Sequence, residues 1–235
     1  MTSLEFRDRL ARRARRAKAP LTLAMLGPLE AYFRLLTLWN SKINLTALPL
    51  EAPTDETFDR LLVEPLAAAP HLTWGQTRVR SGVRHPSDPN VWLDLGSGGG
   101  SPAIPLLIAQ PTLKLTMIES KTRKAAFLRE AIRFVGLPTA NVMNERFEDV
   151  AQQANYSHGA HFVTVRAVKA DAALFEIAGQ LLNETGRLLL FRPSHDPSPD
   201  PPGFARVSTV QLTDAPHAFL CSYRRVFHVE QRGRI

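Results

Sequence analysis

The sequence predicts an α/β protein with a Rossmann-like fold: a mostly parallel sheet of roughly seven strands, an antiparallel hairpin at one edge, and a helical extension at the N-terminus. Three observations predict this fold. Short apolar segments alternate with helical segments from residue 91 onward, a glycine-rich turn follows the first apolar segment, and no long helix separates the last two β-rich stretches. Alternating strands and helices are typical of parallel sheets, whereas consecutive strands pair as hairpins.

The composition favours a soluble chain with a polyanionic partner. The chain has 235 residues, 44% of them hydrophobic, and a formal net charge of +7. That apolar fraction supports one sizeable core, and no apolar run reaches the roughly 18 to 20 residues of a membrane span. The single cysteine, Cys221, leaves no internal disulfide and predicts a reducing, cytoplasmic location. The positive charge favours nucleic acid, because basic side chains neutralise phosphates.

The N-terminal part is predicted to be helical and basic. Residues 7–18 carry seven basic side chains among alanines, and we expect either a solvated helical arm or an arm that grips a nucleic-acid backbone. Apolar residues at helical spacing predict one helix over 21–39, which Gly27-Pro28 breaks or starts. A second helix is predicted over 54–69, with Thr54 as its N-cap.

The segment 76–90 is polar, basic and rich in Gly, Pro and Ser, so we expect a basic loop there. It would separate the helical part, residues 1–75, from a Rossmann-like domain over 91–235. The predicted strands of that domain cover 91–95, 113–118, 141–143, 162–165 and 186–191, and a hairpin covers 205–212 and 218–226. Its predicted helices cover 102–109, 121–135 and 170–182.

The turn after the first predicted strand is suited to a nucleotide-containing cofactor. It contains Gly96, Gly98 and Gly100, which let the backbone turn tightly and approach a ligand without a Cβ in the way. Asp94 precedes these glycines. Glu119 ends the next predicted strand, and an acid at that position can hold the hydroxyls of a ribose.

Two cofactors fit this pattern, and a third interpretation is a glycine-rich turn without a ligand. Gly98, Gly100 and Ala103 satisfy the G-x-G-x-x-A pattern of dinucleotide sites. S-adenosylmethionine is favoured instead, because Asp94 could hold the methionine ammonium and would repel a pyrophosphate. The position of the loop behind a helical region, and Glu148 after the third strand where an adenine edge could be read, point the same way.

Three segments resemble the RsmG (GidB) family of small-subunit ribosomal RNA methyltransferases, which methylate guanine at N7. Residues 38–47 (LWNSKINLTA) are similar to the family's W-N-x-x-x-N-L-T signature, which is the most specific of the three. Residues 93–106 (LDLGSGGGSPAIPL) are similar to its glycine loop. Residues 144–148 (NERFE) and 165–167 (VRA) resemble its R-x-E and S-R-A elements.

The resemblance implies S-adenosylmethionine as cofactor and ribosomal RNA or the small ribosomal subunit as substrate. Together with the residue patterns, it predicts a cofactor site at Asp94, Gly96, Gly98, Gly100, Glu119, Phe147, Glu148 and Arg166. Substrate contacts are predicted at Asn44, Lys121, Arg146 and Arg192. We expect a monomer without membrane contact, and no metal, because the seven histidines lack metal-ligand spacing.

No catalytic residue is predicted, because guanine N7 carries a lone pair and no proton, so methylation there needs no general base. The sequence lacks the [DN]-P-P-[YFW] tetrad common in amino-group methylation, since residues 165–168 read VRAV. Cytosine C5 methylation needs a cysteine nucleophile, and Cys221 lies in a predicted core strand.

The chain departs from the family pattern at Leu61, Val165 and Pro193, and the loop at 76–90 looks like an insertion. These departures keep two other hypotheses open. One is an RNA-binding protein that retains the fold without turnover. The other is a small-molecule enzyme, either a methyltransferase or a nicotinamide-dependent reductase, which would show no salt-sensitive affinity for RNA.

Overall fold

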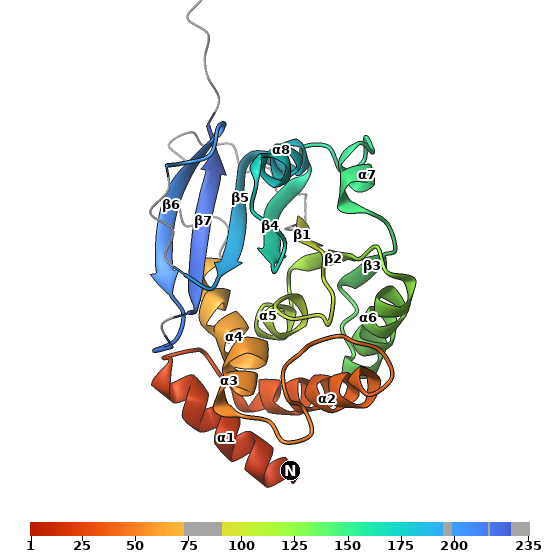
Figure 1. The fold of residues 1–235 in the computed structure, drawn as a ribbon, viewed down its shortest axis with the longest axis vertical. Helices are drawn as coiled ribbons and strands as arrows, with labels where there is room; N and C mark the ends of the chain where they lie inside the picture. Colours follow the sequence, from red (N-terminus) through yellow and green to blue (C-terminus); the bar gives the residue numbers. More distant parts are fainter. Residues whose placement is uncertain (73–90, 195–198, 216, 227–235) are drawn as a thin grey trace, which may run out of the picture.

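The computed structural model describes residues 1–72, 91–194, 199–215 and 217–226 (Figure 1). The predicted basic loop at 76–90 lies outside the described residues, so the division of the chain at that loop stays a prediction. Among the residues that are described, no helix combines the length and the apolar character needed to cross a bilayer.

The predicted seven-stranded, mostly parallel sheet is confirmed. Its strand order is β3-β2-β1-β4-β5-β7-β6, and β1 to β5 run parallel. β7 pairs antiparallel with β5 and with β6, which makes the expected edge hairpin. The strands are β1 (Val91–Leu95), β2 (Lys114–Ile118), β3 (Ala140–Met143), β4 (Ala160–Arg166), β5 (Leu182–Arg192), β6 (Phe204–Gln211) and β7 (Phe219–Arg225).

Helices cover both faces of the sheet (Figure 1). On one face, α2 and α4 pack with α5 and α6 in a buried cluster that includes the inner side chains of β1 and β2. On the other face, α8 packs on β4 and β5 with α7 beside it, and Cys221 is fully buried there, as expected. The helices are α1 (Ser3–Arg16), α2 (Leu23–Asn40), α3 (Asp55–Phe58), α4 (Glu64–Ala68), α5 (Ala103–Ala109), α6 (Thr122–Val135), α7 (Phe147–Ala151) and α8 (Ala172–Leu181).

The prediction that Gly27-Pro28 breaks or starts a helix is wrong. α2 begins at Leu23 and continues through Pro28. Proline removes one backbone donor, and the carbonyl left without its partner is that of Ala24. Ala24 is exposed in the first turn of the helix, where water can satisfy its carbonyl. The fixed backbone angle of proline otherwise suits a helix.

The single helix predicted over 54–69 is divided into α3, a turn with i→i+5 hydrogen bonding (η1, Asp59–Val63), α4, and a short 3-10 turn (η2, Ala69–His71). Thr54 caps α3, as predicted, by accepting a hydrogen bond from the Thr57 backbone. In η1 the Glu64 amide donates to the Asp59 carbonyl, which leaves the Arg60 carbonyl free of the helix. Pro65 has no N–H for the Leu61 carbonyl, so two adjacent carbonyls can accept from outside.

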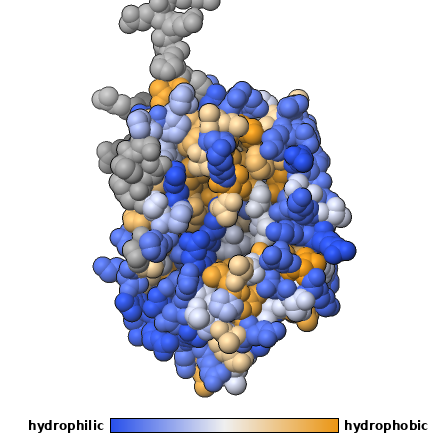
Figure 2. Space-filling model, viewed as in Figure 1, coloured by the Kyte–Doolittle hydropathy of each residue, from blue (hydrophilic) through white to orange (hydrophobic). Residues whose placement is uncertain are grey.

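The expected basic arm is α1, a helix packed against the rest of the molecule. Phe6, Leu10 and Ala14 are buried on its inner face. Its arginines contact acids of the following elements: Arg9 pairs with Asp55, Arg13 with Asp59, and Arg16 with Asp214. The lower left of Figure 2, where α1 lies in Figure 1, is mainly hydrophilic. Arg12 and Arg15 of this helix are exposed.

Candidate functional site

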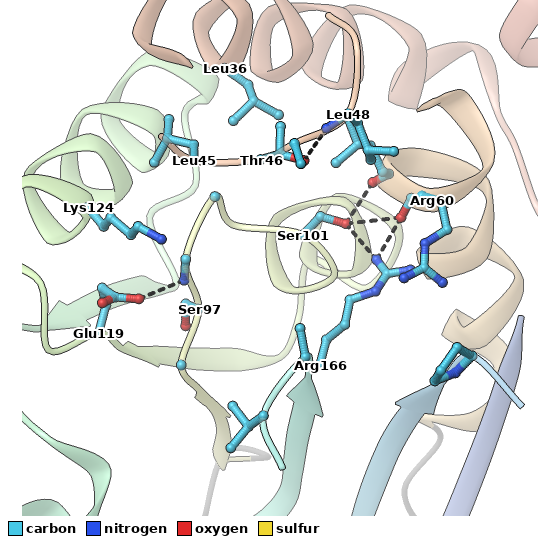
Figure 3. Close-up of a pocket in the computed structure, with 18 of the residues that line it drawn as sticks. Leu36, Leu45, Thr46, Leu48, Arg60, Ser97, Ser101, Glu119, Lys124 and Arg166 are labelled. Carbon is cyan, nitrogen blue, oxygen red and sulfur yellow. Dashed lines mark hydrogen bonds between the residues drawn. The ribbon is translucent and has the colours of Figure 1, made fainter. Parts of the chain in front are cut away.

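A cavity of about 640 Å³ opens at the carboxyl ends of β1, β2 and β4 (Figure 3). In an open α/β sheet this edge is where ligands bind, because the loops that follow the parallel strands meet there. One wall is the turn after β1, residues 96–101, together with Glu119 and Lys124. The opposite wall comes from the N-terminal part of the chain, at residues 45–48, Glu56 and Arg60.

The glycine turn has the backbone that the sequence predicts. Gly96, Gly98 and Gly100 have φ values of 70°, 53° and 84°, in the left-handed region that favours glycine. Gly100 is packed, since a Cβ there would lie 2.6 Å from Ile104. Gly98 is open, since the nearest atom to a Cβ would be 3.8 Å away. Gly98 therefore offers backbone that a ligand can approach closely.

Glu119 holds the turn from the end of β2. Its Oε2 accepts from the Gly98 amide at 2.9 Å, and its Oε1 accepts from the Lys121 amide at 2.8 Å. The side chain lines the cavity although the residue is only 6% exposed. Each carboxylate oxygen has a second lone pair, so Glu119 can accept further hydrogen bonds from hydroxyls without releasing the backbone.

Asp94 lies beneath the turn rather than among the residues that line the cavity. It is 2% exposed, and its Oδ1 accepts from the Thr164 hydroxyl, which itself accepts from the Trp92 indole at 2.8 Å. Burial raises the pKa of Asp94 to about 6, although the Thr164 hydroxyl opposes the shift. The predicted contact of Asp94 with a methionine ammonium stays a prediction.

A second hollow, of about 280 Å³, adjoins the first, and Gly96 lines both. It brings together four of the predicted residues, namely Lys121, Arg146, Phe147 and Glu148. Phe147 and Glu148 of this hollow belong to the start of α7, a short helix that the sequence patterns did not predict. A flat group placed here would lie beside Gly96, the residue that the two hollows share.

Arg166, at the end of β4, lines the first cavity but is held by protein groups. Its guanidinium donates to the Arg60 carbonyl at 2.6 Å and to Ser101 Oγ at 3.1 Å, and it forms an ion pair with Glu64. It also lies over the Phe191 ring, 5.4 Å from the centroid. Burial lowers the pKa of Arg166 and raises that of Glu64, and their mutual attraction opposes both shifts.

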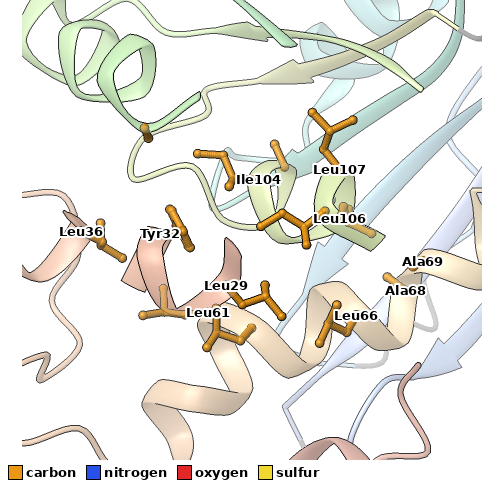
Figure 4. Close-up of a cluster of buried hydrophobic side chains, with 14 of the residues drawn as sticks. Leu29, Tyr32, Leu36, Leu61, Leu66, Ala68, Ala69, Ile104, Leu106 and Leu107 are labelled. Atoms are coloured by element: carbon orange, nitrogen blue, oxygen red, sulfur yellow. The ribbon is translucent and has the colours of Figure 1, made fainter. Parts of the chain in front are cut away.

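The N-terminal helices fix the glycine turn from the other side. The Tyr32 hydroxyl on α2 donates to the Gly99 carbonyl at 2.6 Å, and the Ser101 hydroxyl donates to the Leu61 carbonyl at 2.9 Å. Around these bonds, side chains of α2, η1, α4 and α5 pack together, as Figure 4 shows for Tyr32, Leu61 and Ile104. Sequence patterns indicated no site role for Tyr32, Ser101 or Glu64, because the residues that they bind are distant in the chain.

The family-like signature at 38–47 forms part of the cavity wall in an unexpected way. The Asn40 carboxamide accepts from the Leu45 and Thr46 amides, both at 2.9 Å, and so shapes the loop that lines the cavity. Asn44, the predicted substrate contact, is exposed and is not among the lining residues. Arg192, at the end of β5, is half-buried and lines neither hollow.

The three departures from the family pattern lie in packed or lining positions. Leu61 and Pro193 line the cavity, and Val165 is buried in β4. Within the described residues, no three side chains among His, Cys, Asp and Glu are grouped as a metal site would require.

Comparisons with known proteins agree with this geometry. The family model described as "rRNA small subunit methyltransferase G" (GidB) matches residues 25–198. A relative named ribosomal RNA small subunit methyltransferase G, from Xanthomonas axonopodis pv. citri, is 36% identical over 73% of this chain and 71% of its own length. A protein of the same name from Stenotrophomonas maltophilia is 35% identical over 75% of this chain and 73% of its own length. The chain therefore belongs to the rRNA small subunit methyltransferase G family.

Proposed function

We propose that this chain transfers a methyl group from S-adenosylmethionine to N7 of a guanine in small-subunit ribosomal RNA. The names of the family and of its relatives support the substrate class. The observation that carries the proposal is the pair of hollows that share Gly96: one of about 280 Å³ beside Phe147, and one of about 640 Å³ that Glu119 lines and that has room for a base.

The residues present suit S-adenosylmethionine. Glu119 keeps free lone pairs for the two ribose hydroxyls, and Phe147 and Glu148 border a hollow of a size for adenine. Gly98 offers open backbone to the methionine part. When bound, the cofactor supplies a methyl group on a positively charged sulfur, which is electrophilic enough for direct attack by a ring nitrogen.

The cavity also suits a target that needs no general base. N7 of guanine presents its lone pair in the plane of the ring, so the protein has only to align the base and exclude water. Leu36, Leu45 and Leu48 supply an apolar surface for the ring, and the fixed glycine turn lies across from them (Figure 3). The N7-methylated ring is cationic, which carboxylates near the cavity stabilise.

Three cations support binding of RNA next to these hollows. Lys121 and Arg146 line the second hollow, and Lys124 lines the first. All three lie at the border of the proposed cofactor site, where they could contact phosphates of a bound RNA. RNA affinity should therefore fall steeply with salt, as expected for phosphate neutralisation.

The first experiment is calorimetry with S-adenosylmethionine, using NAD as the comparison ligand. We expect micromolar binding of S-adenosylmethionine alone, roughly −8 kcal/mol at 1 μM. Glu119→Gln should weaken this binding about tenfold or more, because a buried acceptor is lost, whereas Glu184→Gln, at an exposed position of β5, should not. Binding of NAD instead, or an unchanged affinity in Glu119→Gln, would contradict the cofactor site.

The second experiment measures turnover on small ribosomal subunits that lack the modification. Digestion and mass spectrometry of the rRNA should reveal 7-methylguanosine after incubation with the protein and S-adenosylmethionine. A methyl group on another atom would contradict the N7 assignment, but the protein would still be a methyltransferase. RNA binding without any turnover would instead favour a non-enzymatic protein that retains the fold.

A further inference from the structure

Glu56 is a carboxylate of the cavity wall that no sequence motif singled out. It is the second residue of α3, lines the 640 Å³ cavity and is exposed to it. Its backbone is well fixed, because Thr54 and Thr57 cap each other reciprocally and the Thr57 hydroxyl donates to the Pro49 carbonyl at 3.1 Å. Glu56 therefore borders the cavity from a well-fixed turn, on the wall formed by the N-terminal part of the chain.

The neighbouring carboxylates already have partners. Asp55 pairs with Arg9 and Asp59 with Arg13, while Glu64 pairs with Arg166. Glu119, across the cavity, accepts from two backbone amides. In the part of the chain that the structure describes, the Glu56 carboxylate has no ion pair and no hydrogen bond, so its acceptor positions are available to a ligand in the cavity that it lines.

An unused carboxylate is unexpected on the wall of a site that binds RNA, because it repels phosphates. Its chemistry suits a base instead. Guanine presents two adjacent donors, N1–H and one N–H of its 2-amino group, and a carboxylate can accept both at once. Adenine has an acceptor at N1, so the same carboxylate would reject it. N7 lies on the opposite side of the purine, the side that would face the glycine turn.

We propose that Glu56 binds the N1–H and 2-amino group of the target guanine and thereby selects guanine and orients N7 toward the cofactor. This inference rests on the proposed function. During transfer the N7 lone pair forms a bond to the methyl carbon, the carbon–sulfur bond breaks, and its electron pair stays on sulfur. The positive charge moves to guanine, so its hydrogen bonds to a carboxylate strengthen in the transition state.

The directions of the changes in RNA affinity and in kcat distinguish binding of the base by Glu56 from a purely electrostatic effect on the RNA. Removing a negative charge beside a polyanion should leave RNA binding unchanged or tighter. If Glu56 contacts the base in the transition state, Glu56→Gln should nevertheless lower kcat by about 10- to 100-fold, because one charged acceptor is lost. The KM for small subunits should not rise, and the Kd for S-adenosylmethionine should stay within about twofold.

The test compares wild type, Glu56→Gln and the control Glu51→Gln, whose side chain is exposed and lies outside this cavity. Each variant is assayed on unmodified small subunits and on subunits reconstituted with inosine at the target, since inosine lacks the 2-amino group. Wild type and Glu51→Gln should prefer guanosine over inosine by about tenfold, and Glu56→Gln should lose most of this preference.

Two results would overturn the inference. If wild type binds S-adenosylmethionine and methylates the subunit, but Glu56→Gln keeps its kcat within twofold and its preference for guanosine, Glu56 does not contact the base and the proposed function stands. If wild type fails in both assays, the proposed function fails and this inference fails with it.

Discussion

Two basic segments look alike in the sequence and differ in the structure. In α1 four of the seven basic side chains between residues 7 and 18 form ion pairs, with Glu30, Asp55, Asp59 and Asp214. At the start of α6, Lys121, Arg123 and Lys124 form no ion pair within the described residues, and the first turn of α6 contains no acid. Two of these three cations line the hollows.

The difference shows how charge is used in each region. The arginines of α1 complete the contact between the first helix and the rest of the molecule. The cations of α6 stand at the positive end of a helix dipole, where they cost stability. Cations that lower stability and lie beside a cavity are typical of a surface that binds a polyanion. We therefore propose α6, rather than α1, as the helix that contacts the RNA.

The largest expected effect would come from breaking the α1 contact. Arg13→Ala leaves the Asp59 carboxylate, at 4% exposure, without its main partner. We expect the free energy of unfolding to fall by about 3 kcal/mol, measured by urea denaturation, because a buried charge stays uncompensated. Arg12→Ala, at an exposed position of the same helix, is the control. A loss of rRNA affinity without a loss of stability in Arg13→Ala would reverse the comparison.

Asp94 is a second buried acid, and within the described residues it forms no ion pair with an arginine, unlike Asp59. The pKa of Asp94 in the folded state is about 6, against an ordinary value of 3.8, so the folded protein holds this proton more tightly. Its contribution to stability is complete below pH 4 and is lost as the pH rises through 6, by roughly 3 kcal/mol. Asp94→Asn should therefore gain stability relative to wild type between pH 4 and pH 7 in urea titrations. A pH-independent difference would mean that Asp94 is not desolvated.

The smallest effect on stability is expected at α6. The triple substitution of Lys121, Arg123 and Lys124 by alanine should leave the unfolding free energy unchanged or slightly higher. It should lower rRNA affinity about 10- to 100-fold at low salt and reduce the slope of log affinity against log salt by about 2 to 3. Filter binding over a salt series measures both. The same slope in the triple variant and wild type would remove α6 from the RNA contact.

Local patterns predicted the sheet and the backbone of the glycine turn well. The alternation of strands and helices gave the order of the elements, and the helix predicted over 121–135 is α6, Thr122–Val135. Gly96, Gly98 and Glu119 meet because each follows a parallel strand. Such features depend on periodicity and on residues a few positions apart, which a sequence displays directly.

The opposite wall of the cavity could not be predicted in this way. Tyr32 meets Gly99 and Arg166 meets Glu64 across 67 and 102 positions of the chain. Glu56 acquires its place only because η1 and the caps of α3 turn it toward the glycine turn. Asp94 and Arg166 carried charges that suggested ligand contacts, yet burial and tertiary partners decide what those charges bind. Sequence patterns do not record these partners.

The i→i+5 turn at Asp59–Val63 also sets how the preceding segment, α3, is rotated about the helix axis. One extra residue per turn rotates the preceding segment by about 100° relative to a regular helix. Deleting a single residue there would restore a continuous α-helix. The Arg60 carbonyl would then accept a hydrogen bond within the helix, and Arg166 would lose it as an acceptor. It would also swing Glu56 away from the cavity. A one-residue gap at this place in related chains would thus mark a protein with a differently shaped site, even where every motif is kept.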